Sequence, residues 1–256
     1  MPALCPHCQS IRLKFQGTGT EKVEAEIAKL FPQSRICRFD RDTIERKADL
    51  LKFYRDFTEN KFDILVGTQL LAKGWDLEHV GLIGVINADT ILSMPDFRSN
   101  ERTFQLITQV SGRAGRRSFP GKAIFQTYTP DNFAISAAVS HDYDKFFRQE
   151  LSHREEFSYP PFSRLIKCAF KHVSFEQAFS AAEDLILKLK NANLKQAEIL
   201  GPSPAFVSRV RGQFKVYVII KLIIEGTSLE LPKELAQILK SLPRPWDVDV
   251  DPDNLL

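Results

Sequence analysis

The sequence has no phosphate-binding loop. No Gly-x4-Gly-Lys-Ser/Thr segment occurs in its 256 residues, and no Asp-Glu-x-His segment follows a predicted strand. The first kind of segment cradles nucleotide phosphates on backbone N–H groups, and carboxylates like those of the second hold the metal ion. We therefore expect the chain by itself to supply no more than part of a nucleotide-hydrolysing site.

Long apolar runs, signal sequences and disulfide frameworks are absent as well. No stretch approaches the roughly 18 apolar residues that a membrane span needs, and no signal-peptide pattern follows Met1. The four cysteines are scattered, which fits a reducing cytoplasm. There are no internal repeats, and the net charge of +3 permits nucleic-acid binding without requiring it. The sequence predicts a soluble cytoplasmic protein of one large or two ordinary domains, with no membrane partner.

The most informative segment is Gln109-Val-Ser-Gly-Arg-Ala-Gly-Arg116. Read as a helix, its i, i+3, i+4 and i+7 positions share one polar face. That face would carry Gln109, Gly112, Arg113 and Arg116. The apolar positions that would dock the same helix onto a core are Leu106, Ile107, Val110 and Ala114.

Two glycines and two arginines in one helix suggest close approach by a phosphate. Gly112 and Gly115 would each cost about 1 kcal/mol relative to alanine inside a helix. Guanidinium groups are always charged, and their planar donor forks match phosphate oxygens. The alternative is an ordinary solvated, basic helix end, which is common on protein surfaces.

A second segment combines a buried strand with a polar turn. The run Phe62–Val66 is apolar and β-branched, and it leads into Gly67-Thr-Gln-Leu-Leu-Ala-Lys-Gly-Trp-Asp76. Ligands of open α/β folds collect at the carboxyl ends of such strands. The carboxylate of Asp76, in the turn after Gly74, could hold a ribose hydroxyl or an arginine. The alternative is a plain strand–turn–helix in which Gly and Asp only form the turn.

Together the two segments resemble motifs V and VI of superfamily 2 helicases. The pattern Gly-Thr-x5-Gly-x-Asp precedes Gln-x2-Gly-Arg-x2-Arg, with the strand-like run Leu82–Ile86 between them. More narrowly, the chain resembles the primosomal protein N′ family of bacterial replication-restart helicases. The supporting stretches are Gly17–Glu21, Leu30–Pro32, Arg38–Thr43, Gly67–Gly74, Asp96–Arg102, Gln109–Arg116, Tyr159–Phe162, Leu200–Pro204 and Asp249–Pro252.

The resemblance implies a role for each matching residue. Catalytic roles fall to Arg113, Arg116 and Gln109, and nucleotide contacts to Gly74, Asp76 and Gly112. DNA contacts fall to Gly67, Thr68, Gln69 and Lys73. At Trp75-Asp76 the chain departs from the family, which often has a histidine-containing pair; Asp76 instead follows the wider superfamily pattern.

The resemblance also implies cofactors and partners. It indicates ATP with Mg, bound at a site that a first lobe would complete, and a structural Zn. It indicates forked or single-stranded DNA, primosome proteins and single-stranded DNA-binding protein as partners. The chain would then be the C-terminal portion of a longer helicase that restarts stalled forks. The alternative is a non-catalytic DNA-binding or primosome-scaffold fragment.

The cysteines are of two kinds. Cys37 and Cys168 lie in apolar, strand-like contexts and are expected to be inert. Cys5 and Cys8 form a Cys-x2-Cys pair whose spacing suits tetrahedral zinc, although one pair supplies only two of four ligands. The resemblance implies that this pair is the last of a zinc-binding set. For the chain alone, a reduced dithiol without metal is the alternative.

The hydrophobic pattern predicts an α/β fold with a parallel sheet covered by helices on both faces, the second RecA-like lobe of a helicase. The expected strands are 11–15, 36–39, 62–66, 82–86 and 122–128. Thr18 and Glu21 would form a capping box on a helix with the buried stripe Val23, Ile27 and Leu30. A second helix would bury Ile44, Ala48, Leu51 and Tyr54, and Asp131 would cap helical material ending near Glu156.

A break at Tyr159-Pro-Pro-Phe162 separates this lobe from a second domain, because proline removes an N–H donor and disfavours helix before it. Beyond it the pattern is strand 164–171, helix 174–191, strands 197–209 and 213–224, helix 229–241 and strand 247–250. This βαββαβ order is ferredoxin-like. The expected domains are a zinc-region remnant (1–10), the helicase lobe (11–156) and the ferredoxin-like domain (157–256).

A basic hairpin tip is expected between the two middle strands of that domain. It would bring together Arg209, Arg211, Lys215 and Phe214. Such a tip could bind phosphates and a base face, with Arg209 and Arg211 as DNA contacts. Basic tips are equally common as solubility features of edge strands.

Overall fold

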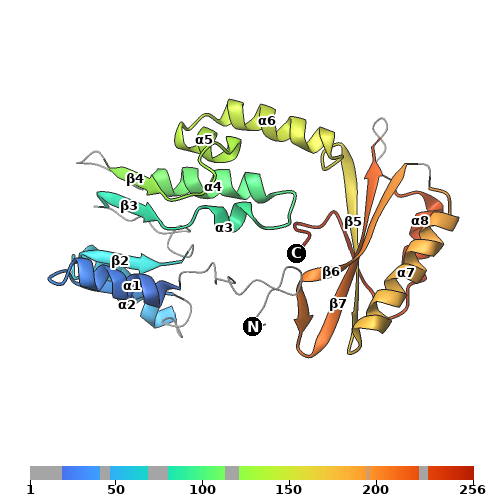
Figure 1. Ribbon diagram of the computed structural model, residues 1–256, viewed down its shortest axis with the longest axis horizontal. Coiled ribbons are helices and arrows are strands. Elements are labelled where there is room, and N and C mark those ends of the chain that lie inside the picture. Colours follow the sequence, from blue (N-terminus) through green and yellow to red (C-terminus); the bar gives the residue numbers. More distant parts are fainter. Residues whose placement is uncertain (1–18, 41–46, 69–79, 113–120, 195, 225–229) are drawn as a thin grey trace, which may run out of the picture. The chain divides into compact units, whose positions relative to one another are not determined.

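A computed structural model describes residues 19–40, 47–68, 80–112, 121–194, 196–224 and 230–256 (Figure 1). Its fold is mixed α/β. By its internal contacts the chain divides into two compact units, Met1–Ile83 with Gly112–Lys122, and Gly84–Ser111 with Ala123–Leu256. No helix in the described ranges is long and apolar enough to cross a membrane.

In its described residues, the first unit contains two helices and a pair of parallel strands. They are α1 (Thr20–Leu30), β1 (Ile36–Phe39), α2 (Lys47–Thr58) and β2 (Ile64–Gly67). The strand register runs from Ile36 opposite Ile64 to Phe39 opposite Gly67. Phe53 of α2 is buried against the ring of Phe39, with 4.3 Å between ring centroids, and it also stacks on Phe62. This aromatic cluster fixes α2 to the strands.

Several expectations for this unit are wrong. No side chain caps α1, because the N-cap is Gly19 and the hydroxyl of Thr20 instead donates to Asp40; Thr18 lies outside the described residues. Leu30 is 73% exposed, at the last position of α1. Leu51 and Tyr54 are exposed because Phe53 carries the buried contact of α2. Ile44 and the side chain of Ala48 lie outside the described parts.

A second strand pair and a group of helices come next. They are β3 (Leu82–Val85), α3 (Asp89–Leu92), α4 (Ser99–Ser111), β4 (Lys122–Phe125), α5 (Phe133–Val139) and α6 (Tyr143–Glu156). Backbone N–H groups of Lys122 and Gln126 donate to Gly81 and Val85, so β3 and β4 run parallel. In the part of the chain that the structure describes, β1–β2 and β3–β4 are separate two-stranded sheets.

Helix α4 is held by a core of its own with α5 and α6. Phe104 and Ile107 are buried against the alanine-rich face of α5 and against Phe146 of α6. The rings of Phe104 and Phe146 stack at 4.2 Å. The expected cap at Asp131 is wrong, because the side chain of Asn132 accepts the N–H groups that begin α5, and Asp142 caps α6 separately.

The C-terminal part is a four-stranded antiparallel sheet with two helices. Its elements are β5 (Ser163–His172), α7 (Phe175–Asn191), β6 (Ala197–Val210), β7 (Gln213–Ile223), α8 (Lys233–Lys240) and β8 (Asp247–Val250). The strand order is β6-β7-β5-β8, and every neighbouring pair is antiparallel. The expected βαββαβ order is confirmed, and α8 is shorter than expected.

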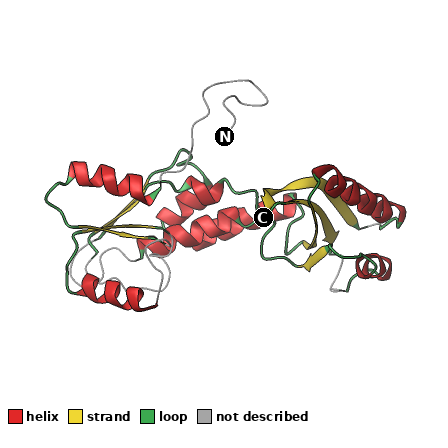
Figure 2. Ribbon diagram, turned by 90° about the horizontal axis from the view of Figure 1, so that it is seen from below, coloured by secondary structure: helices red, strands yellow, loops and turns green. Residues whose placement is uncertain are grey.

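One face of this sheet carries the largest core of the described residues. Helices α7 and α8 lie on the same side of the sheet (Figures 1 and 2). Alternate residues of β5 and β7 point toward them. The fully buried members include Ile166, Cys168, Val216, Val218 and Ile220 from the strands, and Ala178, Ala182, Leu185, Leu189 and Leu235 from the helices.

Replacing Leu185 by alanine is expected to lower the free energy of unfolding by about 2–5 kcal/mol, because the substitution leaves a cavity in this core. Leu185 is 1% exposed, whereas Leu187 on the same helix is 60% exposed. Leu187→Ala makes the same chemical change and should cost less than about 0.5 kcal/mol. Urea denaturation of both variants measures the difference, and equal losses would contradict this assignment of the core.

Candidate functional site

The first candidate region is the carboxyl edge of β1 and β2. The two strands are parallel and end at Phe39 and Gly67, so Asp40 and Thr68 follow at the same edge. Gly67 and Thr68 are exposed. Gln69, Lys73, Gly74 and Asp76, which continue the motif, lie outside the described residues.

A network of charged groups fixes the end of β1. The carboxylate of Asp40 is buried and accepts a 2.8 Å hydrogen bond from the hydroxyl of Thr20. The same carboxylate pairs with Arg38 at 3.2 Å, and Arg38 also lies 3.5 Å from Glu24. These contacts hold the chain where it leaves the sheet. In the sequence, Arg38 and Asp40 stand out only through the family resemblance.

The opposite end of the same strand pair is tied by Arg35 and Asp63. The guanidinium donates to both carboxylate oxygens at 2.8 and 3.0 Å, and the Arg35 N–H donates to one of them as well. These hydrogen bonds lower the pKa of Asp63 to about 2. The pair therefore fixes the starting register of β1 and β2.

Helix α4 carries the beginning of the arginine motif, Gln109–Arg116. Ile107 and Val110 are buried, as expected, and Gln109 is exposed on the opposite side. The expectation of one helix through the whole motif is wrong, because α4 ends at Ser111, whose hydroxyl donates to the carbonyl of Ile107, and Gly112 lies in a turn. Gly112 therefore does not bear the cost of a helix interior.

Residues beyond this turn fall outside the described ranges. They include Arg113, Ala114, Gly115 and Arg116 of the motif. Cys5, Cys8 and the expected strand 11–15, near the start of the sequence, also lie outside the described residues. In the part of the chain that the structure describes, no group of three or more His, Cys, Asp or Glu residues could hold a metal ion. Cys168 is fully buried, and burial raises the pKa of its thiol to about 12, as expected for an inert cysteine.

Asp89, at the start of α3, is an acidic residue with an unexpected set of partners. Its carboxylate accepts hydrogen bonds from the hydroxyls of Thr127 and Thr129 at 2.8 Å and from the N–H of Tyr128. Burial acts to raise the pKa of Asp89, but these hydrogen bonds outweigh it and lower the pKa. The geometry makes Asp89 a link between α3 and the chain after β4. In the sequence, the surrounding Asn87-Ala88-Asp89 gives no sign of this role.

The second candidate region is the hairpin that joins β6 and β7. Arg211 and Gly212 both have positive φ angles, 50° and 81°, which is the backbone of a tight hairpin turn. Arg209 pairs with Phe214, and its guanidinium lies 5.2 Å from the centre of that ring. Of the cluster expected at this tip, Arg209 and Phe214 are therefore in contact, whereas the ammonium group of Lys215 lies 4.9 Å from the centre of the Tyr217 ring.

Apolar side chains extend this surface along β6. Phe206, Val207 and Val210 are 62%, 60% and 49% exposed. The pairing of β6 with β7 is irregular between Pro204 and Arg209, which leaves Phe206 and Val207 outside the regular ladder, whereas Val210 pairs with Gln213. The hairpin surface, Phe206–Gln213, thus combines guanidinium groups with an exposed aromatic ring. Phe206 was not expected here, because a lone phenylalanine in a strand gives no sign of exposure.

Both candidate regions lie within parts of the chain that match known protein domains. The chain matches the helicase conserved C-terminal domain over residues 16–118 and the primosomal protein N C-terminal domain over residues 155–253. These matches define the C-terminal region of a helicase. The chain belongs to the primosomal protein N′ (PriA) family and corresponds to the C-terminal part of its members.

Similar proteins include the replication restart protein PriA of Bacillus subtilis, 43% identical over 240 residues, which cover 94% of this chain and 30% of that protein. The replication restart protein PriA of Synechocystis is 39% identical over 253 residues, 98% of this chain and 30% of the relative. The replication restart protein PriA of Chlamydia pneumoniae is 37% identical over 256 residues, which cover 98% of this chain and 34% of that protein. The chain thus spans about a third of the length of the curated relatives it matches.

The pKa of Asp63 provides a test of the ion pair at the start of β1 and β2. Because this pKa is lower in the folded chain than the ordinary value of about 3.9, the pair stabilises the fold above about pH 4, and this contribution is lost as the pH falls toward 2. Arg35→Gln should raise the pKa toward the ordinary value, although the Arg35 backbone N–H still donates to the carboxylate. NMR titration of the carboxyl carbon measures it. Arg55→Gln, at another exposed arginine, should leave it unchanged; an equal effect of both would contradict the pairing.

Proposed function

We propose that this chain provides the second lobe of an ATP-dependent DNA helicase together with a DNA-binding C-terminal domain. The observation that carries the proposal is the order of the two matches: a helicase C-terminal domain and a primosomal protein N C-terminal domain follow one another in the same chain. The relatives are named as replication restart proteins. The proposed biological role is therefore restart of stalled replication forks and assembly of a primosome.

The proposed fold of the first part is a RecA-like lobe, in which β1–β2 and β3–β4 belong to one parallel sheet with helices on both faces. The order β6-β7-β5-β8 and the βαββαβ sequence support a ferredoxin-like fold for the second part. We place the corresponding domains at residues 11–156 and 157–256. Residues 1–10 are the proposed remnant of a zinc-binding region, with Cys5 and Cys8 as ligands of a structural Zn.

The proposed chemistry is hydrolysis of ATP with Mg at a site that a phosphate loop outside this sequence completes. Arg113 and Arg116 would stabilise the negative charge that develops on the transferred phosphoryl group, and Gln109 would help to orient them or the attacking water. Gly74, Asp76 and Gly112 would contact the nucleotide. Exposure of Gln109 and Gly112 at the end of α4 supports this assignment.

The proposed DNA contacts lie at two places. Gly67, Thr68, Gln69 and Lys73 would bind the DNA backbone at the end of β2. Arg209 and Arg211 would bind phosphates at the hairpin surface, where the exposed ring of Phe206 can stack on a base. Forked or single-stranded DNA, primosome proteins and single-stranded DNA-binding protein are the proposed partners.

The second candidate function is a non-catalytic DNA-binding or primosome-scaffold fragment. The absence of a Gly-x4-Gly-Lys-Ser/Thr segment from these residues favours it for the chain acting alone. The two candidates differ in one respect, because a scaffold gains nothing from the arginines after α4. Arginine substitutions in a longer protein therefore distinguish them.

The 256-residue chain alone should hydrolyse no ATP above background, and a longer protein with a phosphate loop before this sequence should hydrolyse it. There, Arg116→Ala should lower kcat at least about a hundred-fold, because an arginine acting on the transferred phosphoryl group contributes roughly 10³–10⁵ in rate. Arg116→Lys should restore little, since lysine lacks the planar fork. Steady-state assays with single-stranded DNA measure both variants.

Arg148→Ala, at an exposed arginine of α6, is the charge-matched control for this measurement and should keep the activity of the unaltered protein. A folded Arg116→Ala protein with unchanged DNA-stimulated hydrolysis would refute the catalytic role. The motif would then be a basic surface.

The hairpin surface is tested by the double substitution Arg209→Ala and Arg211→Ala in the 256-residue chain. If both side chains bind phosphates, affinity for single-stranded DNA should fall, and the slope of log K against log[salt] should become less steep by about 1.4, or about 0.7 for each phosphate no longer bound. Lys188→Ala with Lys190→Ala removes the same charge from the exposed side of α7 and is the control. Fluorescence anisotropy over a salt series gives both slopes, and parallel changes in the two proteins would rule out a specific role for the tip.

A further inference from the structure

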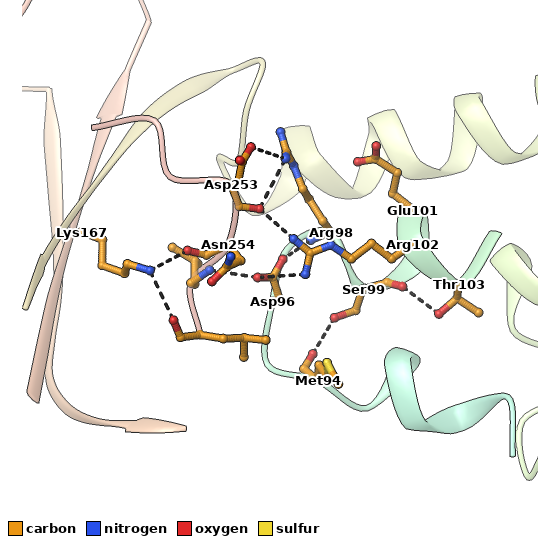
Figure 3. Close-up of polar contacts among 12 residues, drawn as sticks. Met94, Asp96, Arg98, Ser99, Glu101, Arg102, Thr103, Lys167, Asp253 and Asn254 are labelled. Atoms are coloured by element: carbon orange, nitrogen blue, oxygen red, sulfur yellow. Dashed lines mark hydrogen bonds and ion pairs between the residues drawn. The ribbon is translucent and has the colours of Figure 1, made fainter. Parts of the chain in front are cut away.

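The C-terminal segment Asp251–Leu256 lies between the four-stranded sheet and the start of α4, and it is bonded to both (Figure 3). On the sheet side, the N–H of Asp251 donates to the carbonyl of Leu165 at 2.8 Å. The ammonium group of Lys167 donates to the carbonyls of Asn254 at 2.8 Å and Leu256 at 3.3 Å. The segment is thus fastened to β5 at both of its ends.

On the α4 side, the segment donates a hydrogen bond to the buried carboxylate of Asp96. One oxygen of Asp96 accepts the N–H of Arg98 at 2.8 Å, which forms the turn before α4. The other oxygen accepts the N–H of Leu255 at 2.9 Å. The side chain of Asp96 has no exposed surface, so removal of a partner would leave a buried polar group unsatisfied.

Two arginines complete this side by binding one carbonyl oxygen. Arg102 donates to the main-chain oxygen of Asp253 at 2.8 Å, and Arg98 donates to the same oxygen at 3.3 Å. The carboxylate of Asp253 contributes only a 3.2 Å contact to Arg98, and its side chain is 92% exposed. The arginines therefore recognise the backbone of the segment more than its side chain.

A second set of contacts joins the same two parts near the crossover, the chain from Phe157 to Phe162 that links α6 to β5. The rings of Phe97 and Tyr159 stack at 5.5 Å. Arg154 of α6 donates to Glu101 of α4 at 2.7 Å and to the carbonyl of Pro160 at 3.2 Å. Lys221 of β7 donates to the carbonyl of Phe157 at 2.8 Å. Consistent with these ties, α4 belongs to the same compact unit as the sheet.

We infer that Asp96 and Arg102 are positioning residues that, through the segment Asp251–Leu256, couple the four-stranded sheet, which carries the proposed DNA-binding hairpin surface, to α4, whose last turn begins the arginine motif. Helix α4 has 13 residues and is therefore about 20 Å long. Its first turn is held by this segment, and its last turn carries Gln109. The inference rests on the proposed function, since it assigns a route by which DNA bound at the hairpin affects hydrolysis.

The first test measures amide hydrogen exchange in the 256-residue chain, and it requires no enzymatic activity. Arg102→Ala should speed exchange of the Leu255 and Asp251 N–H groups roughly ten-fold or more, because the segment opens locally. Lys167→Met should do the same from the sheet side, with α4 untouched. Asp253→Ala is the control, since it keeps the carbonyl that both arginines bind. Unchanged exchange in both Arg102→Ala and Lys167→Met would overturn the inference.

The second test measures ATP hydrolysis by a longer protein that has a phosphate loop before this sequence. Arg102→Ala and Lys167→Met should leave kcat without DNA within about twofold and should reduce the stimulation by single-stranded DNA at least about fivefold, the lower end of typical coupling between two sites. Asp253→Ala should keep the stimulation. Faster exchange together with full stimulation would overturn the coupling. Absence of hydrolysis in the unaltered protein would instead overturn the proposed function, while the exchange result would stand.

Discussion

The antiparallel pairing of β5 with β7 is the constraint on which the C-terminal half of the molecule depends. Ten residue pairs, from Ser163 opposite Ile223 to His172 opposite Phe214, align two strands whose faces have different tasks. One face supplies Ile166 and Cys168 to the core under α7 and α8. The other presents Lys167 and Lys221 to main-chain carbonyls of the neighbouring segments. A slip of one residue would exchange the two faces and disrupt both sets of interactions.

Helix α4 is bonded to the segment that follows this sheet, and it carries Gln109, the first residue of the arginine motif. Its middle is fixed by Phe104 and Ile107 in a core with α5 and α6, and its first turn is fixed by polar contacts to the C-terminal segment. Apolar packing resists displacement in any direction, whereas hydrogen bonds to a buried carboxylate also specify orientation. The compact unit that contains α4 consequently crosses the division between the two family matches, at residues 16–118 and 155–253.

Elements with a complete local signal could be predicted from the sequence. Strand β8 was expected at 247–250 and is found there, and α7 begins after Ser174, whose hydroxyl accepts the N–H of Gln177. The end of α4 could not be predicted in this way, because the apolar period continues past Gly112 although the helix does not. Leu30 and Leu51 fit a helical stripe, but they are 73% and 64% exposed, and Phe53 makes the buried contact of α2 instead. Periodicity does not carry that information.

The candidate site shows the same contrast. Arg209 and Phe214 are only five positions apart in the sequence, so their contact at the hairpin could be predicted. Contacts of Arg98 and Arg102 with Asp253 join residues more than 150 positions apart and use a main-chain oxygen. A carbonyl is common to every residue, so no side-chain pattern marks it.

The two buried lysines of the sheet, Lys167 and Lys221, also differ from surface lysines in their chemical reactivity. Lys167 and Lys221 are 9% and 5% exposed, and both ammonium groups are occupied as donors to carbonyls. Amine-reactive reagents attack free, solvated amines, so these two lysines are shielded only while the C-terminal segment and the crossover remain docked on the sheet. The surface lysines Lys188 and Lys190 provide an internal reference in the same chain. Chemical labelling of one pair relative to the other would therefore report how long the sheet and α4 stay joined.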